Sequence, residues 1–168
     1  MSAAGISVFY GAMDEETACA ETCRQETEAV SVGAFESTRE LCALDLTKLP
    51  PVPGFYSDVD AHTRDSISFL HAFVAEVTQP TERDGREDVE YAPTQIVAEY
   101  FRWRFRLYGP GSTRPRLDGI LYPSAQGDGG VNIVLFIERD NFEGVEDGSL
   151  RPDKILRLKS SKTRTFKS

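Results

Sequence analysis

The chain has 168 residues, a formal net charge of −8 and a hydrophobic share of 40%. This length suffices for one domain with a sizeable core, and the acidic balance argues against general nucleic-acid binding. The sequence has no apolar run near the roughly 20 residues that cross a bilayer, nor the basic and apolar regions of a signal peptide. We therefore predict a single domain over residues 1–168, located in the cytoplasm, with no membrane or nucleic-acid partner.

The first predicted elements are a strand and a helix. Residues 7–10 read as a strand, and Gly11 supplies a bend after it. Asp14 is a good N-cap for the helix that follows, and the two glutamates after it suit the positive end of the helix dipole. Tyr10, at the strand end, and Glu21, about two turns into the helix, can therefore face one cleft.

The cysteines and histidines do not favour metal or triad chemistry. Cys19 and Cys23 are four residues apart on the predicted helix, which favours a buried apolar stripe over a metal site. Cys42 belongs to no CxxC pair, and His62 and His71 have no ligand-like spacing. The sequence therefore predicts no metal site.

The rest of the chain mixes strands and helices. Residue patterns predict further strands over 25–36, 41–46, 117–122, 131–137 and 155–159. Apolar residues at helical spacing predict a helix over roughly 58–78, and Pro93 fits the first position of another helix. Because strands dominate both ends and helices cluster in the middle, we expect an α+β fold rather than a doubly wound α/β sheet.

Charge is unevenly distributed along the chain. Residues 14–40 are acidic, whereas residues 151–168 hold seven basic residues against one acidic residue, Asp153. A basic tail could contact RNA or an acidic partner, but a solvated last strand with a frayed end is the commoner explanation.

Three blocks of the sequence resemble a known family in their order and separation. They are Val8-Phe-Tyr-Gly-Ala with Thr17-Ala18 and Glu21; Tyr91-Ala-Pro-Thr-Gln95; and Asp118-Gly-Ile-Leu-Tyr-Pro-Ser124 with Gly129-Gly-Val-Asn132-Ile-Val-Leu-Phe136. Together they span residues 6–136 and are similar to the RES domain, named for an arginine, a glutamate and a serine.

The resemblance implies a fold and a function. The fold would be similar to that of the ADP-ribosyltransferase toxins, with two small packed sheets around an NAD cleft and helices at the flanks. RES proteins are bacterial toxins, each paired with a neighbouring antitoxin, and they degrade NAD by phosphorolysis or hydrolysis of the nicotinamide–ribose bond. The resemblance thus implies NAD as the substrate, no cofactor or metal, and an antitoxin partner; a homo-oligomer is left open.

Two residues match the family's catalytic positions. Glu21 matches the glutamate, which would stabilise the oxocarbenium-like state that forms on the ribose; the alternative is a solvent-facing helix glutamate. Tyr10 would stack on nicotinamide or line its pocket, because an aromatic face suits a flat heterocycle. Its alternative is a half-buried strand aromatic.

Three further residues are candidates for substrate binding: Ser124, Tyr91 and Asn132. Ser124 matches the family's serine and would hydrogen-bond the substrate or orient Glu21, rather than act as a nucleophile; the alternative is a turn serine. Asn132 and Gln95 could brace the site or satisfy backbone groups, and Tyr91 is open between a site role and a structural one.

The resemblance departs from the family at the start of the chain. The family's arginine, which binds the NAD phosphates, lies upstream of the strand that carries Tyr10, and Met1 comes a few residues too late to include it. We therefore expect an N-terminally shortened form or a natural remnant. An NAD-degrading enzyme is the first hypothesis; the alternatives are a degenerate, non-catalytic interaction module and an ADP-ribosyltransferase that acts on a macromolecule.

Overall fold

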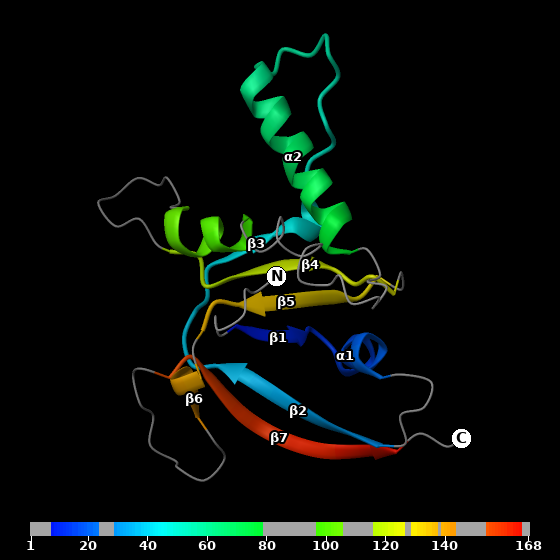
Figure 1. Ribbon diagram of the computed structural model, residues 1–168, viewed down its shortest axis with the longest axis vertical. Coiled ribbons are helices and arrows are strands. Elements are labelled where there is room, and N and C mark those ends of the chain that lie inside the picture. The colour runs from blue at the N-terminus through cyan, green and yellow to red at the C-terminus, as the bar shows by residue number, and fades with distance from the viewer. Residues whose placement is uncertain are drawn as a thin grey trace, which may run out of the picture.

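The computed structural model describes residues 8–23, 29–78, 97–105, 116–126, 129–137, 139–143 and 154–165. These residues form two small sheets with flanking helices, which confirms the expected α+β class (Figure 1). No helix within these ranges is long and apolar enough to cross a membrane.

The larger sheet has four strands in the order β1-β5-β4-β3. Its strands are β1 (Phe9–Ala12), β3 (Ala43–Asp45), β4 (Gly119–Pro123) and β5 (Val131–Leu135). The β1/β5 and β4/β5 pairs are antiparallel, and β3 lies parallel to β4. A side chain at Gly119 would overlap the carbonyl oxygen of Val134, so this glycine lets β4 approach β5 closely. The strands predicted over 41–46, 117–122 and 131–137 are thus confirmed in shortened form.

The smaller sheet has three strands in the order β2-β7-β6. Its strands are β2 (Ala29–Ser37), β6 (Phe142–Glu143) and β7 (Leu156–Thr165). The basic residues of β7 pair with two glutamates: Lys159 lies 3.0 Å from Glu36, and Lys162 lies 2.6 Å from Glu15. The basic tail is therefore a last strand as far as Thr165, most of it exposed, and part of its charge is neutralised within the chain.

Helix α1 (Glu15–Thr22) begins where the sequence predicts. The side chain of Asp14 accepts hydrogen bonds from the backbone N–H of Thr17 at 2.8 Å and from its hydroxyl at 2.7 Å, and these bonds lower the pKa of Asp14. The bend expected at Gly11 is wrong, because β1 continues through it to Ala12. A Cβ at Gly11 would lie 2.9 Å from a ring carbon of Phe9, so the glycine leaves room for that ring.

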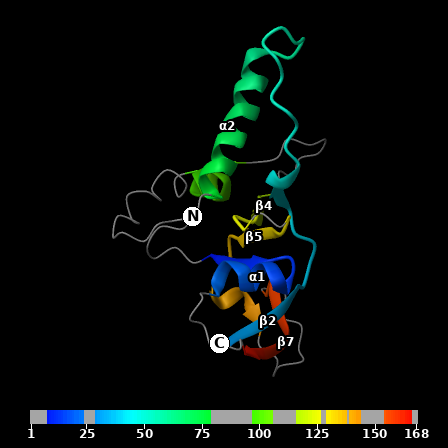
Figure 2. The same cartoon turned by 90° about the vertical axis from the view of Figure 1, so that its right-hand side faces the viewer.

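Helix α2 (Ala61–Val77) confirms the helix predicted over 58–78 and projects from the molecule as an arm (Figures 1 and 2). Asp60 caps its start by accepting the backbone N–H of Thr63 at 2.9 Å. Only the C-terminal part of α2 packs on the sheet, through Phe73 and its neighbours.

The next described helical segment ends in the short π-helix η2 (Tyr100–Arg104). Pro93 lies outside the described residues. Two short 3-10 helices, η1 (Leu46–Lys48) and η3 (Arg139–Asn141), complete the described elements.

The four-stranded sheet separates two hydrophobic clusters. On one face, Ile120 and Val134 pack with the aromatic rings of α2 and η2; on the other, Leu135 packs with Leu156 of the second sheet. This division follows from the alternation of side chains along a strand. The full buried clusters are Leu46, Phe73, Phe101, Leu117, Ile120 and Val134 on the helical face, and Leu135, Ile137 and Leu156 between the sheets.

Candidate functional site

Three of the five predicted site residues meet at one end of the four-stranded sheet. Glu21 lies in the last turn of α1, Ser124 follows β4 and Asn132 lies in β5. One carboxylate oxygen of Glu21, Oε1, accepts hydrogen bonds from the Ser124 hydroxyl at 2.7 Å and from Nδ2 of Asn132 at 2.7 Å. The backbone N–H of Ala125 donates a third bond to the same oxygen at 3.2 Å. Three donors from one hairpin thus hold a single carboxylate oxygen.

The β4–β5 hairpin explains why these donors converge. The backbone N–H of Ser124 donates to the carbonyl of Gly130 at 2.9 Å, which continues the pairing beyond the strands. In register, Tyr122 lies opposite Asn132. Since alternate residues of a strand share a face, Ser124 follows Tyr122 toward the face that carries Asn132. The capped helix α1 then places Glu21 against this face.

Two hydrogen bonds hold the side chain of Ser124 in place beside Glu21. Its side chain is nearly buried, donates to Glu21 and accepts the backbone N–H of Gln126 at 3.1 Å. Asn132 is buried to a similar degree, so both donors are held by the hairpin. Of the two interactions considered for Ser124, the structure contains the one with Glu21.

Glu21 itself is exposed. No described residue donates a hydrogen bond to its second carboxylate oxygen, Oε2. The carboxylate is therefore anchored through Oε1 while Oε2 can meet another molecule. Such an oxygen can accept a hydrogen bond from a hydroxyl group or stabilise a nearby positive charge.

Two tyrosines lie on the same face of the sheet. Tyr10 pairs with Val134, two residues along β5 from Asn132, and its side chain is 48% exposed. The sequence analysis missed Tyr122, which is half-buried opposite Asn132. Burial, followed by the nearby Tyr10 and Glu21, raises the pKa of Tyr122 well above its ordinary value, so its phenol stays protonated at neutral pH. The signal available in the sequence was that Tyr122 lies two residues before Ser124, a spacing that places two side chains on the same face of a strand.

The structure does not describe every residue that the sequence predicted for the site. Tyr91 and Gln95 lie outside the described residues. Cys19 is buried and Cys23 is half-buried, and the described ranges contain no group of His, Cys, Asp and Glu side chains that could hold a metal. The chemical roles of Glu21, Tyr10, Ser124 and Asn132 stay predictions.

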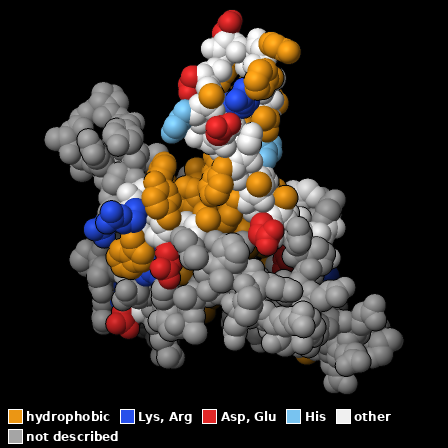
Figure 3. All heavy atoms as spheres, turned by 45° about the horizontal axis from the view of Figure 1, so that its top comes forward, with side chains coloured by type: hydrophobic (Ala, Val, Ile, Leu, Met, Phe, Trp, Pro, Cys, Tyr) orange, Lys and Arg blue, Asp and Glu red, His pale blue; other side chains and the backbone are white. Residues whose placement is uncertain are grey.

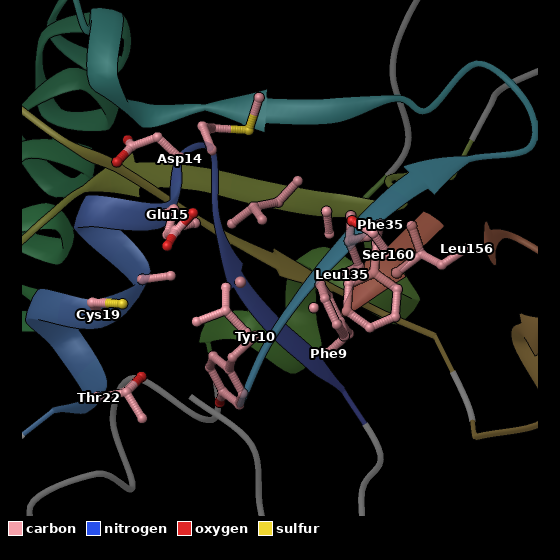
Figure 4. Close-up of a pocket in the computed structure, with 18 of the residues that line it drawn as sticks. Phe9, Tyr10, Asp14, Glu15, Cys19, Thr22, Phe35, Leu135, Leu156 and Ser160 are labelled. Carbon is pink, nitrogen blue, oxygen red and sulfur yellow. The ribbon is translucent and has the colours of Figure 1, made fainter. Parts of the chain in front are cut away.

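A cavity of about 670 Å³ lies between the two sheets, lined by β1, β5, β2, β7 and α1. Figure 4 shows α1 along one side, with Glu15, Cys19 and Thr22 in a row, and Phe9 near Phe35 on the other. The two rings meet edge to face, with centroids 5.2 Å apart. Two packed sheets around a cleft agree with the expected fold class, but of the two residues expected to face one cleft, Tyr10 lines this cavity and Glu21 does not.

The cavity and the Glu21 cluster lie on opposite faces of the larger sheet. Phe9 and Leu135 line the cavity, whereas Asn132 and Tyr122 occupy alternate positions that face the other way. Tyr10 contributes to the cavity lining, although its position on β1 places it on the same face as Tyr122. The two regions therefore meet at the edge strand β1 and at α1.

The family model for the RES domain matches residues 1–154. The chain therefore belongs to the RES domain family. At the level of the family it is a toxin-like, NAD-related domain, and the family is associated in general with NAD-utilising enzyme activity and with antitoxin partners. Searches of the curated proteins and of the solved structures found no match.

Proposed function

We propose that residues 1–168 form one NAD-degrading domain that cleaves the bond between nicotinamide and ribose, by phosphorolysis or hydrolysis. The observation that carries this proposal is the geometry of Glu21, whose Oε1 accepts three hydrogen bonds while Oε2 accepts none from the described residues. A carboxylate held in this way is suited to stabilise charge that develops on a bound substrate.

The chemistry needs little beyond such a carboxylate. When the bond between the ribose C1 and the nicotinamide nitrogen breaks, its electron pair leaves with nicotinamide, which becomes neutral and needs no proton. Positive charge then develops on the ribose, and Oε2 of Glu21 would stabilise it. Phosphate attacks C1 to give ADP-ribose phosphate, or water attacks C1 and releases a proton to give ADP-ribose.

The two tyrosines support the same proposal. Tyr10 offers an exposed aromatic face on the side of the sheet that carries Asn132, and such a face suits the flat nicotinamide ring. On the same side of the sheet, Tyr122 keeps its proton and can donate a hydrogen bond to a substrate oxygen.

The direct test is nicotinamide release from NAD, measured with and without phosphate. We expect Glu21→Gln to lower the rate at least about 100-fold, because the variant keeps the size of the side chain but loses its charge. Ser124→Ala should lower the rate about tenfold, because two donors still hold Oε1. The matched control is Glu16→Gln, an exposed glutamate on the same helix, which should keep the parent rate.

The results also separate the alternatives. ADP-ribose phosphate as the product indicates phosphorolysis, and ADP-ribose indicates hydrolysis. NAD binding without nicotinamide release would overturn the proposal in favour of a non-catalytic module. Transfer of labelled ADP-ribose to a protein would instead indicate an ADP-ribosyltransferase. A Glu21→Gln variant as active as its parent would refute the role given to Glu21.

A further inference from the structure

A hollow of about 320 Å³ lies at the opposite end of β4 from the Glu21 cluster. We call it the arginine hollow, and its polar and aromatic lining residues are Arg102, Trp103, Arg116, Asp118 and Asn141. A strand rises about 3.3 Å per residue, so the length of β4 separates Asp118, before the strand, from Ser124, after it, by roughly 20 Å. The arginine hollow is therefore distinct from the site proposed for NAD cleavage.

The short helix η2, which supplies one side of the arginine hollow, is anchored in the core. Phe101 of η2 packs against Phe73 of α2, with ring centroids 6.2 Å apart, and against Phe105, with centroids 5.5 Å apart. Figure 3 shows hydrophobic side chains at the foot of the projecting arm, with basic side chains beside them. The packing of Phe101 fixes the next two residues, Arg102 and Trp103, at the hollow.

Arg102 is a buried cation at this position. The residue is only 9% exposed, and its guanidinium carbon lies 4.9 Å from the centroid of the Trp103 ring. A contact with the face of a ring leaves the N–H groups of a guanidinium to other partners. A buried guanidinium also attracts an anion more strongly than an exposed one, because its surroundings are less polar than water.

Arg116 adds a second positive charge to the lining. It is exposed, and within the described residues its side chain forms no ion pair or hydrogen bond. It precedes the buried Leu117 and then Asp118, whose backbone N–H donates to the carbonyl of Cys42 at 2.7 Å. The carbonyl of Asp118 accepts the backbone N–H of Phe136 at 2.8 Å. The backbone next to Arg116 is thus held firmly at the hollow.

The carboxylate in the lining is already paired. The two oxygens of Asp118 accept hydrogen bonds from Arg39 at 2.6 and 3.0 Å, and one of them also accepts the backbone N–H of Cys42 at 2.8 Å. Arg39 does not line the hollow, but its charge balances that of Asp118. Arg102 and Arg116 therefore give the hollow an excess of positive charge, in a chain whose net charge is −8.

From this arrangement we infer that the arginine hollow binds a phosphate group. A guanidinium can donate two parallel hydrogen bonds to phosphate oxygens, and a phosphate that carries nearly two negative charges at neutral pH matches two arginines, whereas a carboxylate matches one. The hollow has about ten times the roughly 30 Å³ that one water molecule takes in the liquid, which leaves room for the group that carries the phosphate. Free phosphate and the phosphate of a nucleotide share this chemistry.

Trp103 reports on the arginine hollow, because it is the only tryptophan of the chain. We expect its emission to change and to saturate as inorganic phosphate is added at neutral pH and constant ionic strength. Chloride at the same ionic strength should have no effect, since general screening is then equal. A phosphate titration that gives no saturable change, or the same change as chloride, would overturn the inference.

Two further ligands distinguish the sources of the phosphate. Adenosine monophosphate and adenosine share a base and a ribose and differ only in the phosphate group. Tighter binding of the monophosphate than of inorganic phosphate would assign the hollow to a nucleotide, whose base can lie on the half-exposed Trp103 ring. Equal or weaker binding would assign it to free phosphate. Adenosine that binds as tightly as its monophosphate would overturn the inference, because the phosphate would then contribute nothing.

A pair of arginine variants tests the contact itself. Arg116→Gln should raise the dissociation constant for phosphate about tenfold or more, because a charge-assisted hydrogen bond is lost. Its matched control is Arg104→Gln, which removes the same charge from an exposed arginine of η2 that does not line the hollow, and its effect should be less than about twofold. Equal effects of the two variants would overturn the inference, because net charge and not the hollow would then control binding.

The same titration separates this inference from the proposed NAD chemistry. Glu21→Gln should leave the Trp103 response to phosphate unchanged, whatever its effect on nicotinamide release, because Glu21 lies at the other end of β4. Either proposal can therefore fail without the other. Loss of the Trp103 response in Glu21→Gln would place the phosphate at the Glu21 cluster and overturn the inference.

Discussion

The two sheets of this protein are stabilised in different ways. In the four-stranded sheet, Ile120, Val134 and Leu135 are between 0% and 2% exposed, so hydrophobic packing covers the centre of the sheet on both faces. In the three-stranded sheet, most of β7 is exposed and its basic side chains pair with glutamates. Because burial contributes more than exposed ion pairs, we expect the first sheet to be the rigid base of the Glu21 cluster.

The strongest test of this difference uses one glycine from each sheet. A Cβ at Gly119 would overlap the backbone of β5 and lie 2.8 Å from a methyl group of Leu135, whereas at Gly33 it would meet side chains of Phe35 and Leu158 at 3.0 and 3.2 Å. Side chains can move aside, but a paired backbone cannot. Gly119→Ala should therefore lower the free energy of unfolding by about 3 kcal/mol, and Gly33→Ala by less than about 1 kcal/mol.

Urea unfolding of the two alanine variants measures this difference. Gly54→Ala serves as the control, because no atom lies within 4 Å of the added Cβ; its effect should stay within about 0.5 kcal/mol. Equal losses for Gly119→Ala and Gly33→Ala would contradict the view that the four-stranded sheet is the more tightly packed.

The ion pair at the four-stranded sheet should contribute more to the free energy of unfolding than the ion pairs of the three-stranded sheet. Asp118, at the start of β4, accepts two hydrogen bonds from Arg39, at 2.6 and 3.0 Å, and the backbone N–H of Cys42 at 2.8 Å. Burial raises the pKa of Asp118, but the bonds from Arg39 and Cys42 together with the charge of Arg39 outweigh it, so the net pKa is lowered. Asp118→Asn should cost about 1–2 kcal/mol at pH 7.

The pH dependence of this effect has a definite sign. A carboxylate whose pKa is lower in the folded state stabilises the fold above its unfolded pKa, which is near 3.8, and this stability is lost as the pH falls through the folded pKa. The difference between the parent and Asp118→Asn should therefore be constant from pH 7 to about pH 5 and shrink below pH 4. A difference that persists unchanged at pH 2 would show that the charge of Asp118 is not its source.

The smallest effect is expected at the exposed ion pairs of β7. Glu15 on α1 lies 2.6 Å from Lys162 and 3.7 Å from Arg164. Because these groups are largely in water, Glu15→Gln should change the free energy of unfolding by less than about 0.5 kcal/mol in low salt, and by nothing measurable in 1 M salt. A loss as large as that of Asp118→Asn would remove the energetic distinction between the sheets.

Sequence patterns predicted the local structure well where one short segment contained the signal. The N-cap at Asp14 and the helix predicted over roughly 58–78 follow from capping and periodicity, and both are confirmed, the helix as Ala61–Val77. Gly11 was misinterpreted as a bend because glycine is also tolerated where a neighbouring ring needs space, as beside Phe9. The role of that ring depends on the packing of Phe9 against Phe35 in the other sheet, which no local pattern contains.

The candidate site was predictable in part. Glu21, Ser124 and Asn132 were identified from family blocks, but the sequence could not show that all three meet at one oxygen. Tyr122 was missed because its position on the same face as Tyr10 and Asn132 depends on two strand pairings, β1 with β5 and β5 with β4. The separation of the cluster from the cavity likewise depends on register, since a shift of one residue would exchange the two faces.

By itself, the sequence determined most of the segments that become strands, the helices α1 and α2, the residues that match the RES family, and that Glu21 would lie in a short helix after Tyr10. These properties depend on neighbours a few residues apart, through capping, side-chain alternation and helical spacing. Only the tertiary structure decided that Ser124, 103 residues away, donates to Glu21, and that Asn132 donates to the same oxygen. Such meetings depend on strand order and register, which are set by packing between distant segments rather than by any one of them.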